Sequence, residues 1–204
     1  VACGDLDGDQ IDECFGVTAS GDIYHIDNDL TDWQAIPGKL RQIAACDLNG
    51  DKVEDVAGVT AQGHIYYTLD KTNWHWIAGV LSQLTCADLN GDGLGDLAGV
   101  TPDWDIYYTL DRANWQQIPG KLTQLASGHI NNDPHADLVG VDPTGRIYYT
   151  RNLLHWINVP GVLSQVVVGG FNSDLQGDLI GLSLTGDIYY TLDLINWQPL
   201  PGKF

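Results

Sequence analysis

Five tryptophans, Trp33, Trp74, Trp115, Trp156 and Trp197, stand at a constant interval of 41 residues. The residues around them repeat as well, from SGDIYHIDNDLTDWQAIPGKL in the first copy to TGDIYYTLDLINWQPLPGKF in the last. A fixed period of this size indicates one supersecondary unit that is copied in space. Five copies of about 41 residues fill the 204 residues, which predicts one domain over residues 1–204.

Each copy contains four short apolar segments that are separated by turn residues. In the third copy these are SQLTCA, LAGVT, DIYYTL and Trp115–Ile118, with the loop DLNGDGLGD after the first and Pro119-Gly120 after the last. Short β-branched and aromatic runs between Gly, Asp, Asn and Pro turns favour an antiparallel meander. Five such units predict an all-β fold, a five-bladed β-propeller with four antiparallel strands in each blade.

The two ends of the sequence complement each other. The chain stops at PGKF, where other copies continue as KLRQIAAC or KLTQLASG, and it starts at VACGDLDGD, which is that continuation. This predicts that the N- and C-terminal segments join in one blade and close the ring.

Aspartate dominates the charge of the chain. Acidic residues outnumber basic ones 27 to 9, the net charge is −18, and only Glu13 and Glu54 are glutamates. Such a charge argues against binding nucleic acid or an anionic membrane, and no apolar run is long enough for membrane insertion. A chain that begins with Val and contains no Met is interpreted as processed and secreted, with an expression artefact as the alternative.

The four cysteines lie in the first half of the chain. Their spacing matches no zinc motif. Cys3 and Cys14 flank an acidic loop almost symmetrically, so a cross-strand disulfide is one expectation for them. The alternative is that all four, with Cys46 and Cys86, are small buried apolar residues.

Three acidic loops place oxygen-bearing side chains at positions 1, 3, 5 and 9, with a backbone carbonyl at position 7. These residues are Asp5, Asp7, Asp9, Ile11 and Glu13; Asp47, Asn49, Asp51, Val53 and Asp55; and Asp88, Asn90, Asp92, Leu94 and Asp96. Calcium takes six to eight oxygen ligands in a tolerant geometry, so each loop is a candidate calcium site. An EF-hand is excluded because position 12 is glycine.

The fourth and fifth loops lack the acid at position 1, where His129 and Gly170 stand. Their remaining candidate ligands are Asn131, Asp133 and Asp137, and Asn172, Asp174 and Asp178. We therefore expect three good calcium sites and two weak or empty ones. The alternative for every loop is a turn that binds no ion. The acid at position 9, between two strands, resembles the calcium loops of integrin-α (FG-GAP) propellers.

The segment after each periodic tryptophan is specific. It occurs as WQAIPGKLRQI, WHWIAGVLSQL, WQQIPGKLTQL and WINVPGVLSQV, and GVTASGDIY or a close variant precedes it. This pattern resembles the tectonin repeat. The resemblance implies a β-propeller lectin that recognises glycans on microbial or egg-cell surfaces. The acidic loop and the five copies depart from the family pattern and leave the sugar open.

The resemblance directs attention to the repeated aromatic residues as sugar-binding candidates. They are Trp33, Trp74, Trp115, Trp156 and Trp197 together with Tyr24, Tyr66, Tyr107, Tyr148 and Tyr189. The alternative is that each tryptophan is a packing wedge between blades. Trp104 is unrepeated and stands in a turn, so we expect it to be exposed and to contact ligand. Equivalent weak sites would make the protein multivalent and able to agglutinate cells.

Two further functions remain as alternatives. TLDKTNW and TLDLINWQPL resemble a turn of five-bladed glycoside hydrolases and the sialidase Asp-box, which supports the fold more than a reaction. A glycosidase needs two carboxylates across one pocket, whereas Glu13 and Glu54 fall in or beside the acidic loops. We therefore expect no enzyme activity. A calcium-dependent adhesion propeller that binds a protein is the other alternative.

Overall fold

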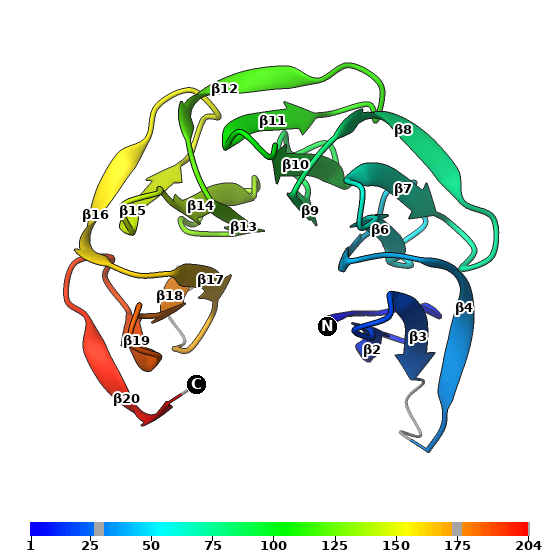
Figure 1. Cartoon of the computed structure of the whole chain (residues 1–204), viewed down its shortest axis with the longest axis horizontal. Coiled ribbons are helices and arrows are strands. Elements are labelled where there is room, and N and C mark those ends of the chain that lie inside the picture. The colour runs from blue at the N-terminus through cyan, green and yellow to red at the C-terminus, as the bar shows by residue number, and fades with distance from the viewer. Residues whose placement is uncertain (27–30, 173–176, 204) are drawn as a thin grey trace.

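The computed structural model describes residues 1–26, 31–172 and 177–203, and within these ranges it contains strands and no helix. Consecutive strands form five antiparallel sheets of four, so the predicted fold and the number of strands per blade are confirmed. The sheets, here blades 1 to 5, follow one another around a common centre (Figure 1). No helix in the described part of the chain could cross a membrane.

The strand bounds follow the sequence repeat. The first strands are β1 (Ala2–Gly4), β5 (Gln42–Cys46), β9 (Gln83–Ala87), β13 (Gln124–Gly128) and β17 (Gln165–Gly169). The second strands are β2 (Glu13–Val17), β6 (Asp55–Val59), β10 (Asp96–Val100), β14 (Asp137–Val141) and β18 (Asp178–Leu182). The third strands are β3 (Asp22–Ile26), β7 (His64–Thr68), β11 (Asp105–Thr109), β15 (Arg146–Thr150) and β19 (Asp187–Thr191). The fourth strands are β4 (Trp33–Lys39), β8 (His75–Val80), β12 (Gln116–Lys121), β16 (Ile157–Val162) and β20 (Gln198–Lys203).

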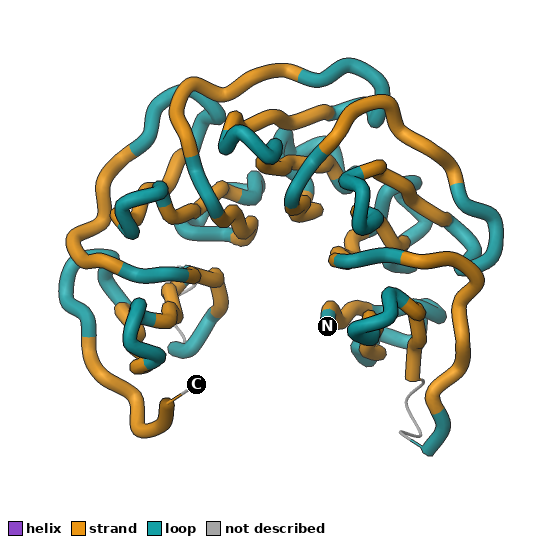
Figure 2. Tube along the Cα trace, in the orientation of Figure 1, coloured by secondary structure: helices purple, strands orange, loops and turns teal. Residues whose placement is uncertain are grey.

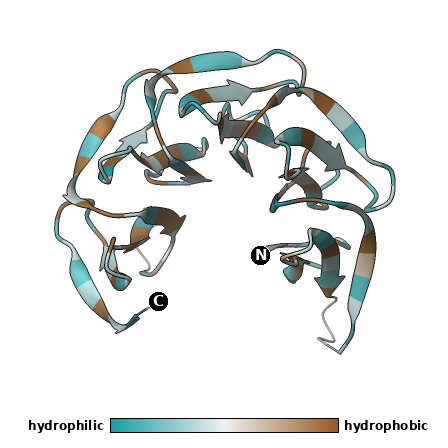
Figure 3. Ribbon diagram, in the orientation of Figure 1, coloured by the Kyte–Doolittle hydropathy of each residue, from teal (hydrophilic) through white to brown (hydrophobic). Residues whose placement is uncertain are grey.

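The core lies between blades. Strands β6, β10 and β14 are buried along their whole length because each is covered on both faces. The fourth strands lie at the periphery and alternate between hydrophilic and hydrophobic segments (Figure 3). One apolar cluster joins Ile65 and Ile77 of blade 2 to Trp115 of blade 3. Burying such a side chain stabilises the fold by about 1.5–3 kcal/mol, so each blade needs a neighbour.

Two hydrogen bonds recur at the boundaries between blades. The Gln42 side chain donates to the Leu84 carbonyl and accepts from the Leu84 N–H, and Gln83 and Gln124 bond Leu125 and Val166 of the next blade in the same way. Four of the five periodic tryptophans donate a hydrogen bond from the indole N–H to a backbone carbonyl of the preceding blade: Trp74, Trp115, Trp156 and Trp197. The same side-chain contacts therefore hold neighbouring first strands together from blade 2 to blade 5.

The terminal segments do not share a blade, so this part of the prediction is wrong. Strand β1 pairs with β2 in blade 1, and β20 pairs with β19 in blade 5. The blades describe an arc whose first and last members face each other across an opening (Figure 2). The physical reason is local: β1 has its hairpin partner β2 directly after the first acidic loop, so it pairs there before any distant strand can compete.

All four cysteines are bonded. Cys3 and Cys14 lie opposite each other on β1 and β2, as their positions around the first loop predicted. Cys46 and Cys86 join β5 of blade 2 to β9 of blade 3. The alternative of four free buried cysteines is therefore wrong.

Candidate functional site

The acid at position 1 shapes each of the first three loops. Asp88 accepts hydrogen bonds from the backbone N–H groups of Gly91 (2.6 Å) and Gly93 (2.9 Å). Asp5 and Asp47 accept the equivalent pairs, from Gly8 and Gln10 and from Gly50 and Lys52. The backbone of each loop therefore curls around the first carboxylate.

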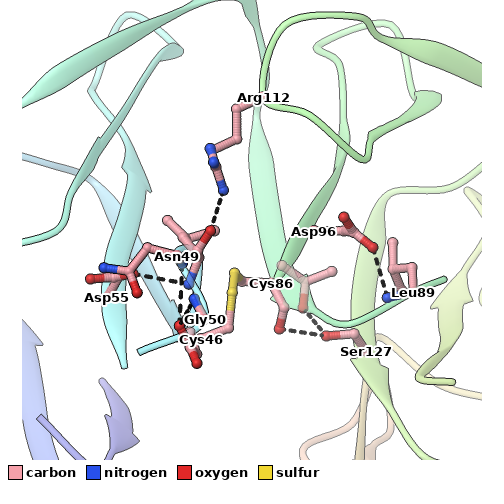
Figure 4. The surroundings of a disulfide bond; sticks show 12 residues. Cys46, Asn49, Gly50, Asp55, Cys86, Leu89, Asp96, Arg112 and Ser127 are labelled. Carbon is pink, nitrogen blue, oxygen red and sulfur yellow. Dashed lines mark hydrogen bonds between the residues drawn. A yellow bond between two sulfur atoms is a disulfide. The ribbon is translucent and has the colours of Figure 1, made fainter. Parts of the chain in front are cut away.

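The acid at position 9 is buried at the base of the loop. Glu13 accepts a hydrogen bond from the Leu6 N–H (2.7 Å), and Asp96 accepts one from the Leu89 N–H (2.9 Å, Figure 4). Both side chains are at most 2% exposed. In each, the second carboxylate oxygen has no hydrogen-bond partner among the described residues. A buried carboxylate oxygen without a donor is costly, and a cation removes that cost.

The electrostatics of these loops point the same way. The pKa of Asp55 and Asp96 is raised to about 6, chiefly by burial and also by nearby aspartates, while a backbone N–H opposes the shift. Burial, followed by Asp12, Asp5 and Asp47, raises the pKa of Glu54 to about 7. Close carboxylates that are held in a partly buried site repel one another, and a divalent cation would relieve this repulsion.

The donor set of the first loop fits calcium. Oxygens of Asp5, Asp7 and Glu13 lie within 4.8 Å of one another. Calcium–oxygen distances are about 2.3–2.6 Å, so oxygens on opposite sides of one ion stand up to about 5 Å apart. At positions 3 and 5, the side chains of Asp7 and Asp9 each accept a hydrogen bond from the backbone N–H two residues further along the chain. The same hydrogen bond occurs in the second and third loops, at Asn49, Asp51, Asn90 and Asp92. The carbonyls of Ile11, Val53 and Leu94 remain predicted ligands.

The last two loops replace the missing acid in different ways. In the fourth loop the His129 ring nitrogen contacts the His135 carbonyl (3.1 Å) and bridges the loop. Asp137 still has a buried oxygen without a partner in the described part of the chain. In the fifth loop the Asn172 amide donates to Asp178 (3.3 Å), the acid at position 9. Asp174 lies outside the described residues. The fourth loop therefore keeps a feature of the first and third that the fifth has lost.

Basic residues of the following blade hold the loops in place. Arg112 of blade 3 donates to the Leu48 carbonyl of the second loop (Figure 4), and Lys71 of blade 2 donates to the Leu6 carbonyl of the first. The Cys46–Cys86 disulfide lies beside the second loop in the same view. These contacts join the loops to the boundaries between blades, so an ion in a loop would also stabilise those boundaries.

Three equivalent grooves lie between blades, and three of the five predicted Trp–Tyr pairs line them. The volumes are 270 Å³ between blades 1 and 2, 330 Å³ between blades 3 and 4, and 260 Å³ between blades 4 and 5. Their aromatic pairs are Trp74 with Tyr66, Trp156 with Tyr148, and Trp197 with Tyr189. The opposite wall is the glycine and leucine at the end of the preceding blade.

The tryptophans also pack as wedges. The indole N–H of Trp156 donates to the Pro119 carbonyl (2.8 Å), and Trp115 bonds the Ala78 carbonyl in the same way. One tryptophan can therefore be both a packing wedge and a sugar-binding candidate. One edge of its ring is fixed at the boundary between blades, while another part of the ring lines a groove. Trp33 and Tyr24 have no preceding blade, and Trp33 is 51% exposed.

Each groove carries polar groups that the sequence analysis did not single out. They stand in the turn between the second and third strands of a blade. Thr60 lines the groove between blades 1 and 2, Asp142 the groove between blades 3 and 4, and Ser183 with Thr185 the groove between blades 4 and 5. Lys39 and Lys121 also reach grooves, and they form ion pairs with Asp22 and Asp105 (2.8 Å for Lys121). Their recurrence at the repeat period was the signal that could have revealed them.

The two unrepeated tryptophans flank different grooves. Trp104 is 47% exposed, as predicted, and its carbonyl accepts from the N–H of Leu122, which lines the groove between blades 3 and 4. Its φ of 69° is left-handed, a conformation that glycine adopts at this position in blades 1, 2, 4 and 5. Trp76 lies opposite Tyr66 across β7 and β8, so it shares the sheet face that borders the groove between blades 1 and 2.

Sequence comparison identifies the family. The tectonin domain model matches residues 5–132, which is more than half of the chain. The chain belongs to the tectonin domain family. No curated protein matches it. The family assignment agrees with the resemblance that the Trp-Pro-Gly segments indicated.

Solved structures with a similar fold include proteins with different ligands. BBS1N in complex with ARL6DN has a TM-score of 0.66 and 11% identity, and the match covers 94% of this chain and 64% of that one. The lectin SapL1 in complex with alpha methyl fucoside has a TM-score of 0.62 and 13% identity over 99% and 78% of the two chains. YCF48 bound to D1 peptide has a TM-score of 0.57 and 17% identity over 92% and 63%. In these two complexes the match therefore covers less than two thirds of the BBS1N and YCF48 chains.

Proposed function

We propose that this tectonin-family propeller is a multivalent lectin that binds glycans in the grooves between its blades. The observation that carries the proposal is the recurrence of one groove, with a Trp–Tyr pair on one wall and polar side chains at the rim. A repeated shallow site suits a polymeric or clustered ligand, because several weak contacts to one surface raise the effective concentration of each.

The chemistry of the groove suits a sugar ring. The exposed part of Trp156 and the ring of Tyr148 offer apolar faces to the C–H surface of a pyranose, and tyrosine adds a hydroxyl. Asp142 and Lys121 stand close enough to the same groove to hydrogen-bond sugar hydroxyl groups. Trp104 and Trp76 are exposed and stand beside residues that line two of the grooves, so these two grooves are the best candidates for oligosaccharides.

Calcium in this proposal is structural. The acidic loops connect the first and second strands, whereas the polar groove residues stand in the turns between the second and third strands. In an antiparallel meander these connections lie at opposite ends of a blade. Ions held by the first three loops would therefore stabilise the propeller from one face, while glycans bind toward the other. The fourth loop is a weaker candidate, and the fifth is the weakest.

We also propose that the protein is secreted and catalyses no reaction. The two disulfides support an oxidising compartment, where such bonds persist. Glu54, whose raised pKa would suit an acid catalyst, stands between the first two acidic loops and lines none of the three aromatic grooves. We further propose that the protein does not bind nucleic acid, because its net charge is −18, and does not insert into a membrane, because no apolar run is long enough.

The test is a glycan array probed with the purified protein in calcium, followed by agglutination of cells with and without the best sugar. The variant Asp142→Thr installs the residue that blades 2 and 3 carry as Thr60 and Thr101, so it should fold normally while changing affinity in one groove. Tyr148→Ala should weaken binding more. No glycan bound at any concentration by the folded, calcium-loaded protein would overturn the proposal.

The same array separates the lectin from a protein-binding propeller. BBS1N and YCF48, which share the fold, were solved with a protein and a peptide partner. If this chain binds cells but free sugars and glycosidase treatment leave that binding unchanged, the partner is a protein.

A further inference from the structure

The three aromatic grooves share a Trp–Tyr wall but differ at one rim position. This position is Thr60 between blades 1 and 2, Ser183 between blades 4 and 5, and Asp142 between blades 3 and 4. Among the described residues that line these three grooves, Asp142 is the only carboxylate. Its groove also has the largest volume of the three, 330 Å³ against 270 and 260 Å³. In this groove alone, therefore, a lining side chain can present a negative charge to a ligand.

Asp142 has one oxygen committed to its own turn and one left over. Its Oδ1 accepts hydrogen bonds from the backbone N–H and the hydroxyl of Thr144, both at 2.7 Å, and from the backbone N–H of Arg146 at 3.0 Å. No described residue donates a hydrogen bond to its Oδ2. Burial raises the pKa of Asp142, but the hydrogen bonds from Thr144 and Arg146, together with the Arg146 charge, outweigh burial and lower it. Asp142 is therefore an ionised acceptor with one free oxygen.

Lys121 places a hydrogen-bond donor in the same groove. Its Nζ lies 2.8 Å from the Asp105 carboxylate and donates to the Asp103 carbonyl at 2.9 Å. An ammonium group has three N–H donors, so one remains for a ligand. Because the Asp105 carboxylate balances its charge, Lys121 offers a hydrogen bond to a sugar oxygen but little net attraction for an anion. Between blades 4 and 5 the equivalent residue is Val162, whose side chain offers no donor.

Trp104 stands beside this groove in an unfavourable backbone conformation. Its φ is 69°, and the equivalent positions of the other blades are glycines with φ of 84° or 85°. A side chain in this left-handed conformation costs folding energy, and such strain is typical of ligand-binding sites. Trp104 is 47% exposed, and its carbonyl accepts from the N–H of Leu122, on the wall opposite the Trp156 indole. An exposed indole therefore flanks the groove on the side that blade 3 forms.

We propose that the groove between blades 3 and 4 is the principal glycan site and that Asp142 makes it select neutral sugars over acidic ones. The inference rests on the lectin function proposed above and names the ligand class of one groove. Hydroxyl groups of a neutral pyranose donate to Asp142 and accept from Lys121, while the aromatic residues contact the ring. A sugar acid instead brings a carboxylate next to Asp142, and the two like charges repel. The net charge of −18 adds to this repulsion.

The protein carries a separate reporter for each groove. The indoles of Trp74, Trp156 and Trp197 each line one of the three, so tryptophan labelled with nitrogen-15 gives an NMR signal for each site. Single Trp→Phe variants assign the signals. The probes are the methyl glycosides of glucose and galactose and those of the corresponding uronic acids, which carry a carboxylate at C6 in place of the hydroxymethyl group. All titrations are run in calcium at physiological salt and neutral pH.

Wild type should show both the hierarchy and the selectivity. For a neutral probe, the dissociation constant read from Trp156 should be about threefold lower than those read from Trp74 and Trp197. For the matching acid, the constant read from Trp156 should rise about tenfold, because a hydroxyl donor is lost and a like charge is added. The constants read from the other two indoles should change less.

Three variants separate ligand contact from structure. Asp142→Thr should remove most of the discrimination at Trp156, and Thr60→Asp should create it at Trp74, since it moves the carboxylate to the equivalent rim position. Trp104→Gly restores the residue of the other blades, so the melting temperature should not fall. Its affinity for neutral probes at Trp156 should nevertheless fall about fivefold. A Trp104 that acts only in packing would instead lower the melting temperature and leave the affinity unchanged.

The outcomes distinguish this inference from the lectin function. Equal dissociation constants at the three indoles, discrimination that Asp142→Thr leaves unchanged, or no shift of the Trp156 signal with any of the four probes overturns the principal site. A protein that binds glycans on the array but fails in these titrations is a lectin without that site. A protein that binds no glycan on the array contradicts both proposals.

Discussion

Blades 1 to 3 and blades 4 to 5 have the same fold and the same core but different local stabilisers. The first three contain both disulfides and the three loops with an acid at position 1. The last two contain no cysteine, and His129 or Asn172 makes contacts inside loops that lack that acid. The difference teaches that apolar packing between blades defines this fold, while ions and covalent bonds strengthen it locally and can be replaced by hydrogen bonds.

The largest effect that would test this contrast is chelation. Three independent calcium sites, each at a hundredfold excess of ion over its dissociation constant, would stabilise the folded state by about 8 kcal/mol in total. Chelator should therefore lower the melting temperature strongly. Calcium should restore it better than magnesium, which requires a tighter octahedral site. Identical melting curves with chelator and with millimolar calcium would mean that the loops are turns only.

The second effect is loss of the disulfide between blades. The chain-entropy model gives about 4 kcal/mol for Cys46–Cys86, which closes 40 residues of sequence separation, and about 3 kcal/mol for Cys3–Cys14 with its separation of 11. The double variant Cys46→Ser with Cys86→Ser should therefore be less stable than Cys3→Ser with Cys14→Ser in urea unfolding. The reverse order would show that the link between blades 2 and 3 adds little to their packing.

A single loop residue gives the third test. Asp88→Ala should remove one ion and about 2.7 kcal/mol of calcium-dependent stability at a hundredfold excess of ion. The matched variant His129→Ala, at the same position of the fourth loop, should lose only its contact with His135 and should respond to calcium like wild type. Isothermal titration counts the ions. Equal loss of calcium from both variants would place an ion in the fourth loop as well, where Asp137 keeps its unpartnered oxygen.

The smallest effect concerns the turn before each periodic tryptophan. Hydrogen bonds from Asn114, first from its backbone, hold the pKa of Asp111 well below its usual range. Blade 4 carries Asn152 at this position and keeps the backbone contacts. Asp111→Asn should therefore leave the melting temperature almost unchanged, whereas Asp111→Ala should lower it slightly. If Asp111→Asn lowers the melting temperature as much as Asp111→Ala does, the negative charge of Asp111 itself stabilises blade 3, although blade 4 has the neutral Asn152 at this position.

Much of the fold and part of the site could be predicted from the sequence. The period of the tryptophans gave the five blades, and the positions around the first loop indicated the Cys3–Cys14 bond. The Cys46–Cys86 bond was not predictable, because two first strands become neighbours only when blades pack. Likewise, the sequence around Thr60 and Asp142 indicates only turns. Their position beside tryptophans of other strands depends on how the blades pack.

By itself the sequence determined the repeating unit, its four strands, the acid positions of the loops and the family, since each is encoded within about 41 consecutive residues. Only the tertiary structure decided that the two terminal segments stay in separate blades. It also decided which aromatic residues line grooves and which carboxylate oxygens are buried without a donor. These properties depend on the angle between neighbouring blades, and that angle arises from side chains packing across boundaries that no single repeat contains.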